Sequence, residues 1–250
     1  MNNTFEKTYK DILKKVLLEG IESQNRTGEN TIKLFAQALN INLSEGFPIV
    51  TGKKIFFDKA LAEFLWIYNG LTDIKFLNNN NIFWWDKYAV DGIVNKSYGY
   101  QLRSYGGCFD QIDYVISEIK KGSRRAVVSF WNPLDLDVQN LPCCYIDAVF
   151  FRENNRLNCS ITFRSSDLFL GLPYDIIFGA LLLNEICKKT YLEPFKLAVN
   201  LVDAHIYKAH KLAVKKYLKA EIFELPKLNY SKKYYLENYI CGPYIKATLF

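Results

Sequence analysis

The chain has 250 residues, half of them hydrophobic, and a formal net charge of +6. Such an apolar chain, with 17 Tyr and 18 Phe, can bury a large core, which argues against a disordered protein. Charged residues interrupt each apolar run before it is long enough to span a bilayer, and the N-terminal stretch lacks the pattern of a secretory signal. We therefore expect one compact domain over residues 1–250, located in the cytoplasm and without a membrane partner.

Cysteine and histidine content argues against a metal centre. The six Cys residues form no C-x-x-C pair, and only two His residues are present. A zinc site needs such ligands clustered at defined spacing, so we expect no metal and free thiols. The excess of positive charge indicates an anionic partner. Because the basic residues are scattered, we favour a phosphorylated small molecule over a nucleic acid.

Hydrophobic periodicity predicts an alternation of helices and strands along the chain. Residues 5–22 have apolar positions at helical spacing and include Gly20 near the end, and residues 31–43 follow as a partly alternating strand. Further along, the pattern predicts a helix over 57–69, a helix over 109–122, a strand over 125–131, a hairpin of strands 145–152 and 156–165, a buried helix over 174–190, and a strand over 195–207 that leads into a helix. This order predicts an α+β fold with one mixed sheet packed against helices.

Two residues stand out as candidates for chemistry. Cys143 follows a proline at the start of a predicted strand. A buried Cys often only packs, whereas a nucleophilic Cys needs an electropositive, partly open site that favours the thiolate. Glu63 lies in an apolar helical stretch. It is either a solvent-facing side chain or a general acid/base whose pKa is shifted by its surroundings.

Other candidates are polar residues that suit a phosphate and a sugar. Arg is a planar, bidentate phosphate ligand, and several Arg residues sit beside small polar residues, namely Arg26, Arg124, Arg125 and Arg164. Spacing alone does not show that they converge. Asp203, His205 and Tyr207 alternate on a predicted strand and therefore share one face, which either lines a pocket or is simply solvated.

These stretches together resemble the thymidylate synthase family. The resemblance covers nearly the whole chain in the correct order, through "NRTGENT", "GFPIVTGKK", "EFLWIYNG", "SYGYQLR", "SRRAVVSFWNP", "LPCC", "FRSSDLFLGLPYDI", "DAHIY" and the closing "IKATLF". The block Arg-Ser-x-Asp-x-Phe-Leu-Gly-Leu-Pro is highly specific for the family.

The resemblance implies a role for each matching residue. Cys143 resembles the nucleophile that adds to C6 of a pyrimidine, Glu63 the acid/base, and Tyr98 the family's active-site tyrosine. The implied nucleotide site comprises Arg26, Arg164, Ser165, Asp167, Asp175, His205 and Tyr207, with Arg124 and Arg125 donated by the other subunit of a homodimer formed through the sheet. The implied site for the co-substrate 5,10-methylenetetrahydrofolate comprises Trp85, Asp167, Gly171 and Phe250. If the source is a virus, the expected location is the host cytoplasm.

Three positions depart from the family pattern. Cys144 stands where the synthases usually carry His, Phe163 where they usually carry Gln, and Asp175 where their Asn bonds the uracil edge. A plain interpretation of Asp175 is a helix-start residue that complements free N–H groups. A sharper one is substrate choice, because an ionised Asp only accepts hydrogen bonds and suits the N4 amino group of cytosine better than O4 of uracil. An unsatisfied polar group costs ~1–3 kcal/mol, or roughly a five- to 150-fold preference, although a neutral carboxylic acid weakens this argument.

The leading hypothesis is therefore conversion of dCMP to 5-hydroxymethyl-dCMP, because Asp175 resembles the deoxycytidylate hydroxymethylase branch of the superfamily. The alternatives are a dCMP 5-methyltransferase, a thymidylate synthase that converts dUMP to dTMP and tolerates the Asp, and a non-catalytic relative that binds nucleotide or nucleic acid through its basic surface.

Overall fold

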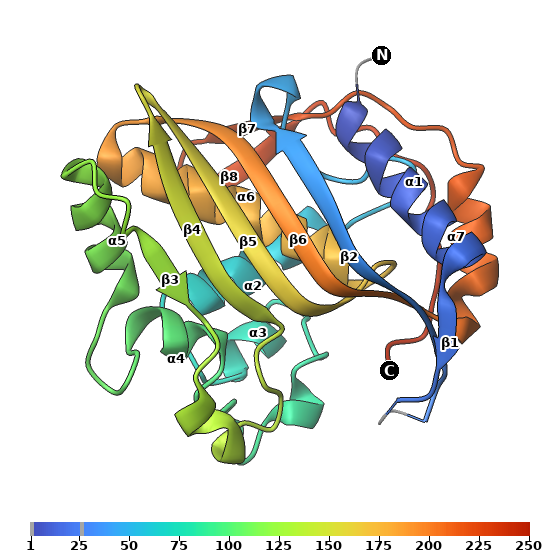
Figure 1. Cartoon of the computed structure of the whole chain (residues 1–250), viewed down its shortest axis with the longest axis horizontal. Coiled ribbons are helices and arrows are strands. Elements are labelled where there is room, and N and C mark those ends of the chain that lie inside the picture. Colours follow the sequence, from blue (N-terminus) through green and yellow to red (C-terminus); the bar gives the residue numbers. More distant parts are fainter. Residues whose placement is uncertain (1–2, 26–27) are drawn as a thin grey trace.

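A mixed six-stranded sheet forms the centre of the structure (Figure 1), a computed structural model that describes residues 3–25 and 28–250. The strand order is β1-β2-β6-β5-β4-β3. The strands are β1 (Ile21–Ser23), β2 (Thr31–Asn42), β3 (Val127–Ser129), β4 (Tyr145–Glu153), β5 (Arg156–Asp167) and β6 (Glu193–Tyr207). A separate hairpin consists of β7 (Lys227–Tyr230) and β8 (Tyr234–Glu237). The helices are α1 (Thr4–Glu19), α2 (Phe57–Tyr68), α3 (Lys75–Asn79), α4 (Tyr98–Arg103), α5 (Gln111–Lys120), α6 (Gly171–Thr190) and α7 (Lys211–Leu218).

The strand pair β5–β6 is parallel, whereas the other pairs of the large sheet are antiparallel. Helix α6 connects the two parallel strands, as a crossover between parallel strands requires. In register, Ser165 lies beside Asp203 and Asp167 beside His205. The carboxyl ends of both strands therefore meet at one edge of the sheet, next to the start of α6.

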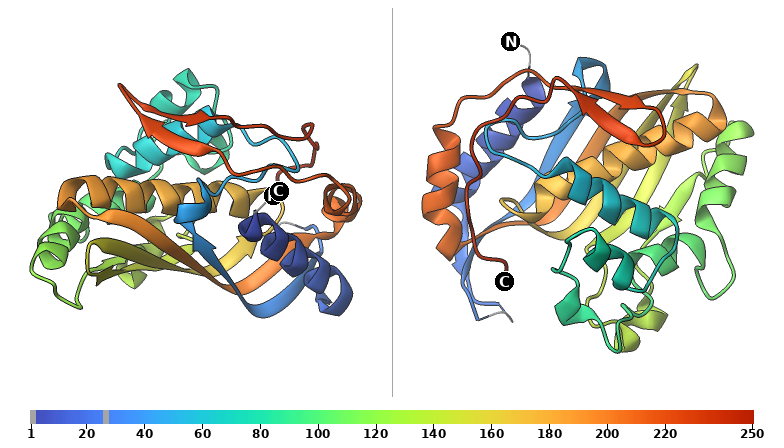
Figure 2. Two further views of the ribbon diagram at one scale, coloured as in Figure 1. Left: turned by 90° about the horizontal axis from the view of Figure 1, so that it is seen from above. Right: turned by 180° about the vertical axis from the view of Figure 1, so that it is seen from behind.

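One face of the sheet is covered by helices. Figure 2 shows α2 and α6 crossing that face when the molecule is viewed from behind, whereas the view of Figure 1 looks onto the opposite face. Alternate residues of β5, such as Leu157, Cys159 and Ile161, are buried under the helices. Helix α6 is buried over most of its length because its apolar residues extend around much of its surface. In the described part of the chain, no helix has the length and apolar character needed to cross a membrane.

Each long element that the periodicity predicts is present, and the α+β fold with a mixed sheet is confirmed. The predicted helix over 174–190 begins earlier, at Gly171, because Pro173 is accommodated within the first turn, where a missing N–H costs nothing. Asp175 therefore lies beyond the first turn, and its interpretation as a helix-start residue is wrong. The periodicity did not reveal the short helices α3 and α4 or the β7–β8 hairpin.

A buried carboxylate joins the first helix to the segment that precedes α2 and to α7 itself. Glu6 accepts hydrogen bonds from the backbone N–H groups of Thr51 and Gly52 at 2.8 Å each, and from the Tyr217 hydroxyl at 2.6 Å. The neighbouring backbone also holds the C-terminal segment, because the Gly242 N–H donates to the Thr51 carbonyl at 2.7 Å. The first helix and the C-terminal segment are thus fixed to the same short stretch of chain.

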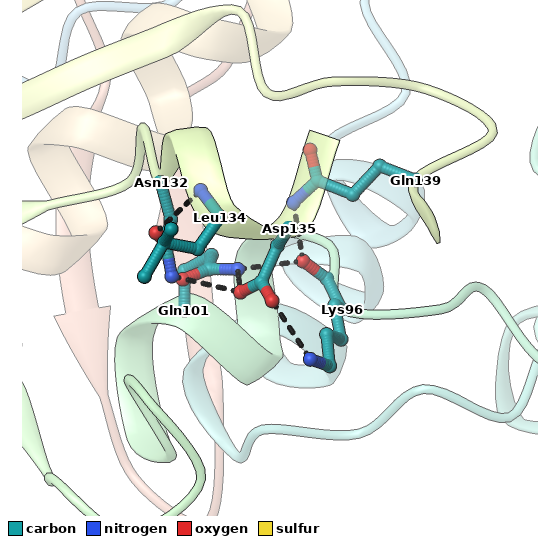
Figure 3. A network of polar contacts seen from close by, with 6 residues as sticks. All are labelled: Lys96, Gln101, Asn132, Leu134, Asp135 and Gln139. Carbon is teal, nitrogen blue, oxygen red and sulfur yellow. Dashed lines mark hydrogen bonds and ion pairs between the residues drawn. The ribbon is translucent and has the colours of Figure 1, made fainter. Parts of the chain in front are cut away.

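A second buried carboxylate, Asp135, anchors the loop that leads to Cys143 (Figure 3). It accepts hydrogen bonds from Lys96 at 2.7 Å, Gln101 at 2.9 Å and Asn132 at 2.8 Å. The Gln139 amide donates to the Lys96 carbonyl at 2.6 Å. The network therefore connects α4 and the turn before it to the short 3-10 helix at Pro133–Val138.

Replacing Asp135 by Ala should destabilise the protein by about 3 kcal/mol, because it leaves three buried or partly buried donors without their common acceptor. Urea unfolding monitored by circular dichroism measures the change. Asp137→Ala is the matched control, since Asp137 is an exposed acid in the same helical turn. Equal effects of the two substitutions would contradict the anchoring role of Asp135.

Candidate active site

A cleft of about 640 Å³ opens at the sheet edge where β5 and β6 end. It brings together most of the residues that the sequence analysis proposed for substrate binding. From that set, the cleft is lined by Tyr98, Arg164, Ser165, Asp167, Gly171, Asp175, His205, Tyr207 and Phe250. The residues come from α4, β5, α6, β6 and the C-terminal segment. Segments far apart in sequence thus converge on one concave site.

Cys143, the proposed nucleophile, does not line the cleft: it is buried, with only 1% of its surface exposed, next to Cys144, which does line it. The Arg164 guanidinium donates to the carbonyl oxygens of Cys143 and Pro142 at 2.9 Å each, so it holds the backbone that carries the thiol. Burial raises the pKa of the Cys143 thiol to about 12, although the Arg164 charge opposes the rise. The partly open, thiolate-favouring environment that we expected of a nucleophile is therefore absent in this form of the protein.

The neighbouring Cys144 lines the cleft itself. Its backbone N–H donates to the Tyr98 hydroxyl at 2.8 Å, and the Arg164 guanidinium lies 3.9 Å from its sulfur. Tyr98 is buried, and its ring packs against Trp85 and Tyr145. Tyr98 and Arg164 thus both hold the backbone of the segment that contains the two cysteines.

Glu63 and Trp85 lie next to the cleft rather than in it. They line an adjoining cavity of about 70 Å³, which shares Tyr98 and Asp175 with the cleft. The Glu63 carboxylate accepts hydrogen bonds from the indole N–H groups of Trp84, at 2.9 Å, and of Trp85. Burial raises the pKa of Glu63 above its ordinary value, and the two indole N–H groups partly offset the rise. The solvent-facing interpretation of Glu63 is therefore wrong.

Trp85 does not line the cleft, and its contact with folate stays a prediction. Only 6% of the residue is exposed, and its ring packs at a tilt of 47° on Trp66, with 5.2 Å between the ring centroids. Trp84, which the sequence analysis did not single out, is the more exposed of the two indoles and lies 6.1 Å from the Tyr174 ring. In this structure the direct role of Trp85 is to hold the Glu63 carboxylate.

Asp175 lies between the cleft and the small cavity and lines both. Its Oδ1 accepts a hydrogen bond from the Tyr145 hydroxyl at 2.8 Å. A Cβ placed on Gly171, which lines the cleft, would stand 3.7 Å from the other oxygen, Oδ2. Burial raises the pKa of Asp175 to about 7, the hydrogen bond from Tyr145 opposes the rise, and the nearby charges of Glu63 and Asp167 add to it. Near neutral pH this carboxyl group therefore takes both protonation states.

Strand β6 forms one wall of the cleft and contributes His205 and Tyr207 to it. His205 Nδ1 lies 3.2 Å from Asp203 Oδ1 and 3.5 Å from the Ser165 hydroxyl, and the ring packs edge-on against Tyr207. The hydrogen bond with His205 lowers the pKa of Asp203. The shared strand face expected for these residues is thus one that lines a pocket rather than a solvated one.

Asp167 and the C-terminal residues meet at buried His210. Asp167 Oδ1 accepts from the Phe169 N–H at 2.9 Å and lies 4.0 Å from His210 Nδ1. His210 Nε2 lies within hydrogen-bond distance, 2.7 Å, of the Thr248 carbonyl oxygen. The terminal Phe250 ring packs on Tyr207 at 4.9 Å and on His210 at 5.7 Å. The C-terminal segment therefore forms one wall of the cleft.

Of the four proposed arginines, two are described by the structure and line no part of the cleft, and a third lies outside the described residues. Arg124 and Arg125 are exposed beside β3 and line no part of this cleft. Arg26 lies outside the described residues. The cleft instead receives positive charge from Lys33 and Lys87, which the sequence analysis missed because lysines are spread along the whole chain. Within residues 3–25 and 28–250, no group of three or more His, Cys, Asp or Glu side chains is placed to hold a metal ion.

The architecture and the site define an α+β enzyme with a deep cleft at the edge of a mixed sheet. The family model described as thymidylate synthase matches residues 7–242. The chain belongs to the thymidylate synthase family. Members of this family transfer one carbon from methylenetetrahydrofolate to a pyrimidine nucleotide, so the protein is a one-carbon transferase of that type.

Asp175→Asn should stabilise the protein in a pH-dependent way. Because the pKa of Asp175 is raised in the folded state, its contribution to stability is present below an unfolded pKa of ~4 and is lost as the pH rises through about 7. The gain from the substitution should therefore grow over this range, to at most roughly 4 kcal/mol by linkage. Urea unfolding of both proteins between ~pH 5 and ~pH 8 measures it, and a pH-independent difference would contradict the raised pKa.

His210→Ala should loosen the C-terminal segment, because it removes the polar partner of Thr248 and a ring contact of Phe250. Loss of about 1 kcal/mol corresponds to roughly fivefold faster amide hydrogen exchange in residues 246–250. Mass spectrometry of peptides from that segment gives the rate. Leu212→Ala, an exposed position on the next turn of chain, is the control and should leave the exchange unchanged.

Proposed function

We propose that the protein converts dCMP to 5-hydroxymethyl-dCMP with 5,10-methylenetetrahydrofolate as the one-carbon donor. The observation that carries this proposal is Asp175, whose carboxyl group lies at the boundary of the cleft with Oδ2 on the side of Gly171. The carboxylate stands where the family usually carries an amide. Its chemistry therefore differs from that of an amide at the point where the base edge is recognised.

The argument for cytosine rests on complementary donors and acceptors. An ionised Asp175 accepts a hydrogen bond from the N4 amino group of cytosine, whereas it places lone pairs against O4 of uracil. A protonated Asp175 can donate to O4 of uracil. Because the pKa of Asp175 is about 7, cytosine should be favoured increasingly as the pH rises above neutrality. The raised pKa of Asp175, which populates its neutral form, is what supports dUMP, and hence thymidylate synthesis, as the second candidate.

We propose the following roles for the other residues of the site, by resemblance to the family. Cys143 adds to C6 of the base, so C5 becomes nucleophilic and attacks the methylene carbon of the folate. C5 then loses its proton and tetrahydrofolate leaves as the protonated amine, which gives an exocyclic methylene group at C5. Water adds to that methylene carbon and gives up a proton, and Cys143 departs from C6 as the thiolate, which restores the C5–C6 double bond. Because burial raises the pKa of Cys143, the thiol is proposed to lose its proton as it adds to C6 rather than in the free protein.

Glu63 is proposed to handle protons on the C5 side of the base. Burial raises its pKa above the ordinary value, which favours the protonated form, and its cavity adjoins Asp175. Arg164 and Ser165 are proposed to bind the phosphate, with Arg26. His205 and Tyr207 are proposed to bind the sugar. Asp167, Gly171 and Phe250 lie on the side proposed for folate, with Trp85 acting there only through Glu63.

We also propose a homodimer formed through the uncovered face of the sheet. Val127, Val149, Phe151 and Val202 are exposed on strands of that face, although a solvated sheet face is usually polar. A second copy would cover them. Arg124 and Arg125 are exposed next to the same sheet, and are proposed to reach the phosphate of the partner subunit.

A competition assay tests the substrate and the reaction together. The protein is incubated with methylenetetrahydrofolate and equal amounts of dCMP and dUMP, and the products are weighed by mass spectrometry. We expect 5-hydroxymethyl-dCMP from the native protein. Asp175→Asn should shift the ratio of kcat/KM for the two nucleotides toward dUMP by roughly 10- to 100-fold, because the amide complements uracil.

Cys143→Ala is the control for covalent chemistry and should form no product. Methyl-dCMP as the product would retain the base assignment and replace the water step by hydride transfer. Thymidylate as the main product of the native protein would overturn the choice of dCMP. An absence of any product would favour a non-catalytic, nucleotide-binding protein.

A further inference from the structure

Tyr145 is a buried tyrosine that the proposed reaction does not use. It is the first residue of β4, and 5% of its surface is exposed. Its ring is enclosed by the rings of Phe163 and Tyr98, each 4.8 Å away, and by Phe178 at 5.1 Å and Phe130 at 5.4 Å. So much aromatic packing leaves the ring little freedom. The hydroxyl is therefore fixed in its position 2.8 Å from Asp175 Oδ1.

We propose that Tyr145 is a specificity-determining residue that acts through Asp175: by donating its proton to Oδ1, it leaves Oδ2 as the single oxygen that reads the base edge, and it favours the ionised form of that oxygen. This inference rests on the proposed function and names the group that controls its selectivity. Tyr145 is a positioning residue, because it reaches the base only through Asp175.

The geometry gives each oxygen of Asp175 a separate task. A phenol donates one proton, so Oδ1 is an acceptor whenever the hydrogen bond is formed. Oδ2 lies on the side of Gly171, a residue that lines the cleft, and in this proposal it carries the proton when the group is neutral. An ionised Oδ2 accepts from the N4 amino group of cytosine, and a protonated Oδ2 donates to O4 of uracil. The protonation state of one atom therefore distinguishes the two bases.

The groups around the Asp175 carboxyl shift its pKa in opposite directions. Burial and the charges of Glu63 on α2 and Asp167 at the end of β5 favour its neutral form. The phenol of Tyr98 on α4 also faces it and stays neutral, because burial raises its pKa well above the ordinary value. Tyr145 is the group whose hydrogen bond lowers the pKa of Asp175. Without it, the carboxyl group should remain neutral to higher pH and lose its preference for cytosine.

The packing around Tyr145 also accounts for a second departure from the family pattern. Phe163 is fully buried directly beside Tyr145 in the sheet, at a position where the family usually carries Gln. Its ring meets the Tyr145 ring at an interplanar angle of 77° and offers no competing polar group. The Tyr145 hydroxyl is therefore directed to Asp175. The side chains at 145, 163 and 175 act as one unit.

The test compares equilibrium binding of dCMP and dUMP, measured by calorimetry without folate, across a pH range that spans about 7. In the native protein, the ratio of the two affinities should rise with a midpoint near the pKa of Asp175. Tyr145→Phe removes one hydroxyl and keeps the aromatic packing. It should move the midpoint up by about one pH unit and lower the preference for dCMP at neutral pH by roughly three- to tenfold.

Two further proteins separate this role from a merely structural one. Tyr217→Phe removes another buried hydroxyl that donates to a carboxylate, Glu6, away from the cleft, and should leave the ratio and its midpoint unchanged. In an Asp175→Asn background, Tyr145→Phe should have no further effect on the ratio. Thermal melts show that each variant is folded. The double variant also shows whether any change in Tyr145→Phe passes through Asp175.

An unchanged midpoint and ratio in Tyr145→Phe would overturn this inference. So would an equal change in the Asp175→Asn background, because Tyr145 would then act independently of the carboxyl group. Failure of the proposed function has a different signature, in which the native protein prefers dUMP throughout the pH range. The three results are therefore distinguishable in one set of titrations.

Discussion

The parallel pairing of β5 and β6 is the constraint on which the site depends. Both strands end at the same edge of the sheet, and the crossover helix α6 begins there because it must follow β5 directly. This arrangement brings Arg164 and Asp167 from one strand, His205 from the next, and Asp175 from the helix into one cleft. A shift of one residue in this register would turn alternate side chains from the cleft into the core. The buried apolar residues on the other positions of β5 prevent such a shift.

The cleft is bordered by two carboxyl groups whose pKa values are raised by burial. Glu63 and Asp175 share a small cavity walled by Trp85, Tyr98 and Tyr145. Aromatic walls remove solvent and favour protonated carboxyl groups, while an indole N–H or a phenol that donates a hydrogen bond limits how far each pKa rises. The pKa of each carboxyl group is thus raised by burial and limited by a hydrogen-bond donor, and that of Asp175 reaches about 7.

The fold could be predicted from the sequence to a large extent, because long elements with regular periodicity pack as their patterns require. The 31–43 strand, the 57–69 helix and the hairpin around 153–155 lie within a few residues of their predicted bounds. Short elements without a full period, such as α4, were missed although α4 carries Tyr98. The position of α4 depends on the buried Asp135 network, in which Gln101 of α4 and Asp135 are 34 residues apart in the sequence.

The site was predictable where a motif fixes several residues at once, as in the segment from Arg164 to Asp175. Contacts between residues far apart in the sequence could not be predicted. The hydrogen bond from Trp85 to Glu63 is an example, because no sequence spacing reveals that contact. Tyr145 gave no signal either, because an aromatic residue at the start of an apolar strand is the ordinary pattern of a core.

In the proposed mechanism, an Asp in place of the family's Asn changes the base preference only together with a second residue, Tyr145, that donates a hydrogen bond to it. A carboxylate placed alone in an aromatic pocket would take a proton, and a neutral acid pairs with either pyrimidine. A hydroxyl donor that is held by packing assigns one oxygen and leaves the other to the base. The apolar Phe163 prevents a competing hydrogen bond beside it. In the proposed mechanism, selectivity for the base edge is therefore a property of the hydrogen-bonded pair Tyr145 and Asp175 rather than of Asp175 alone.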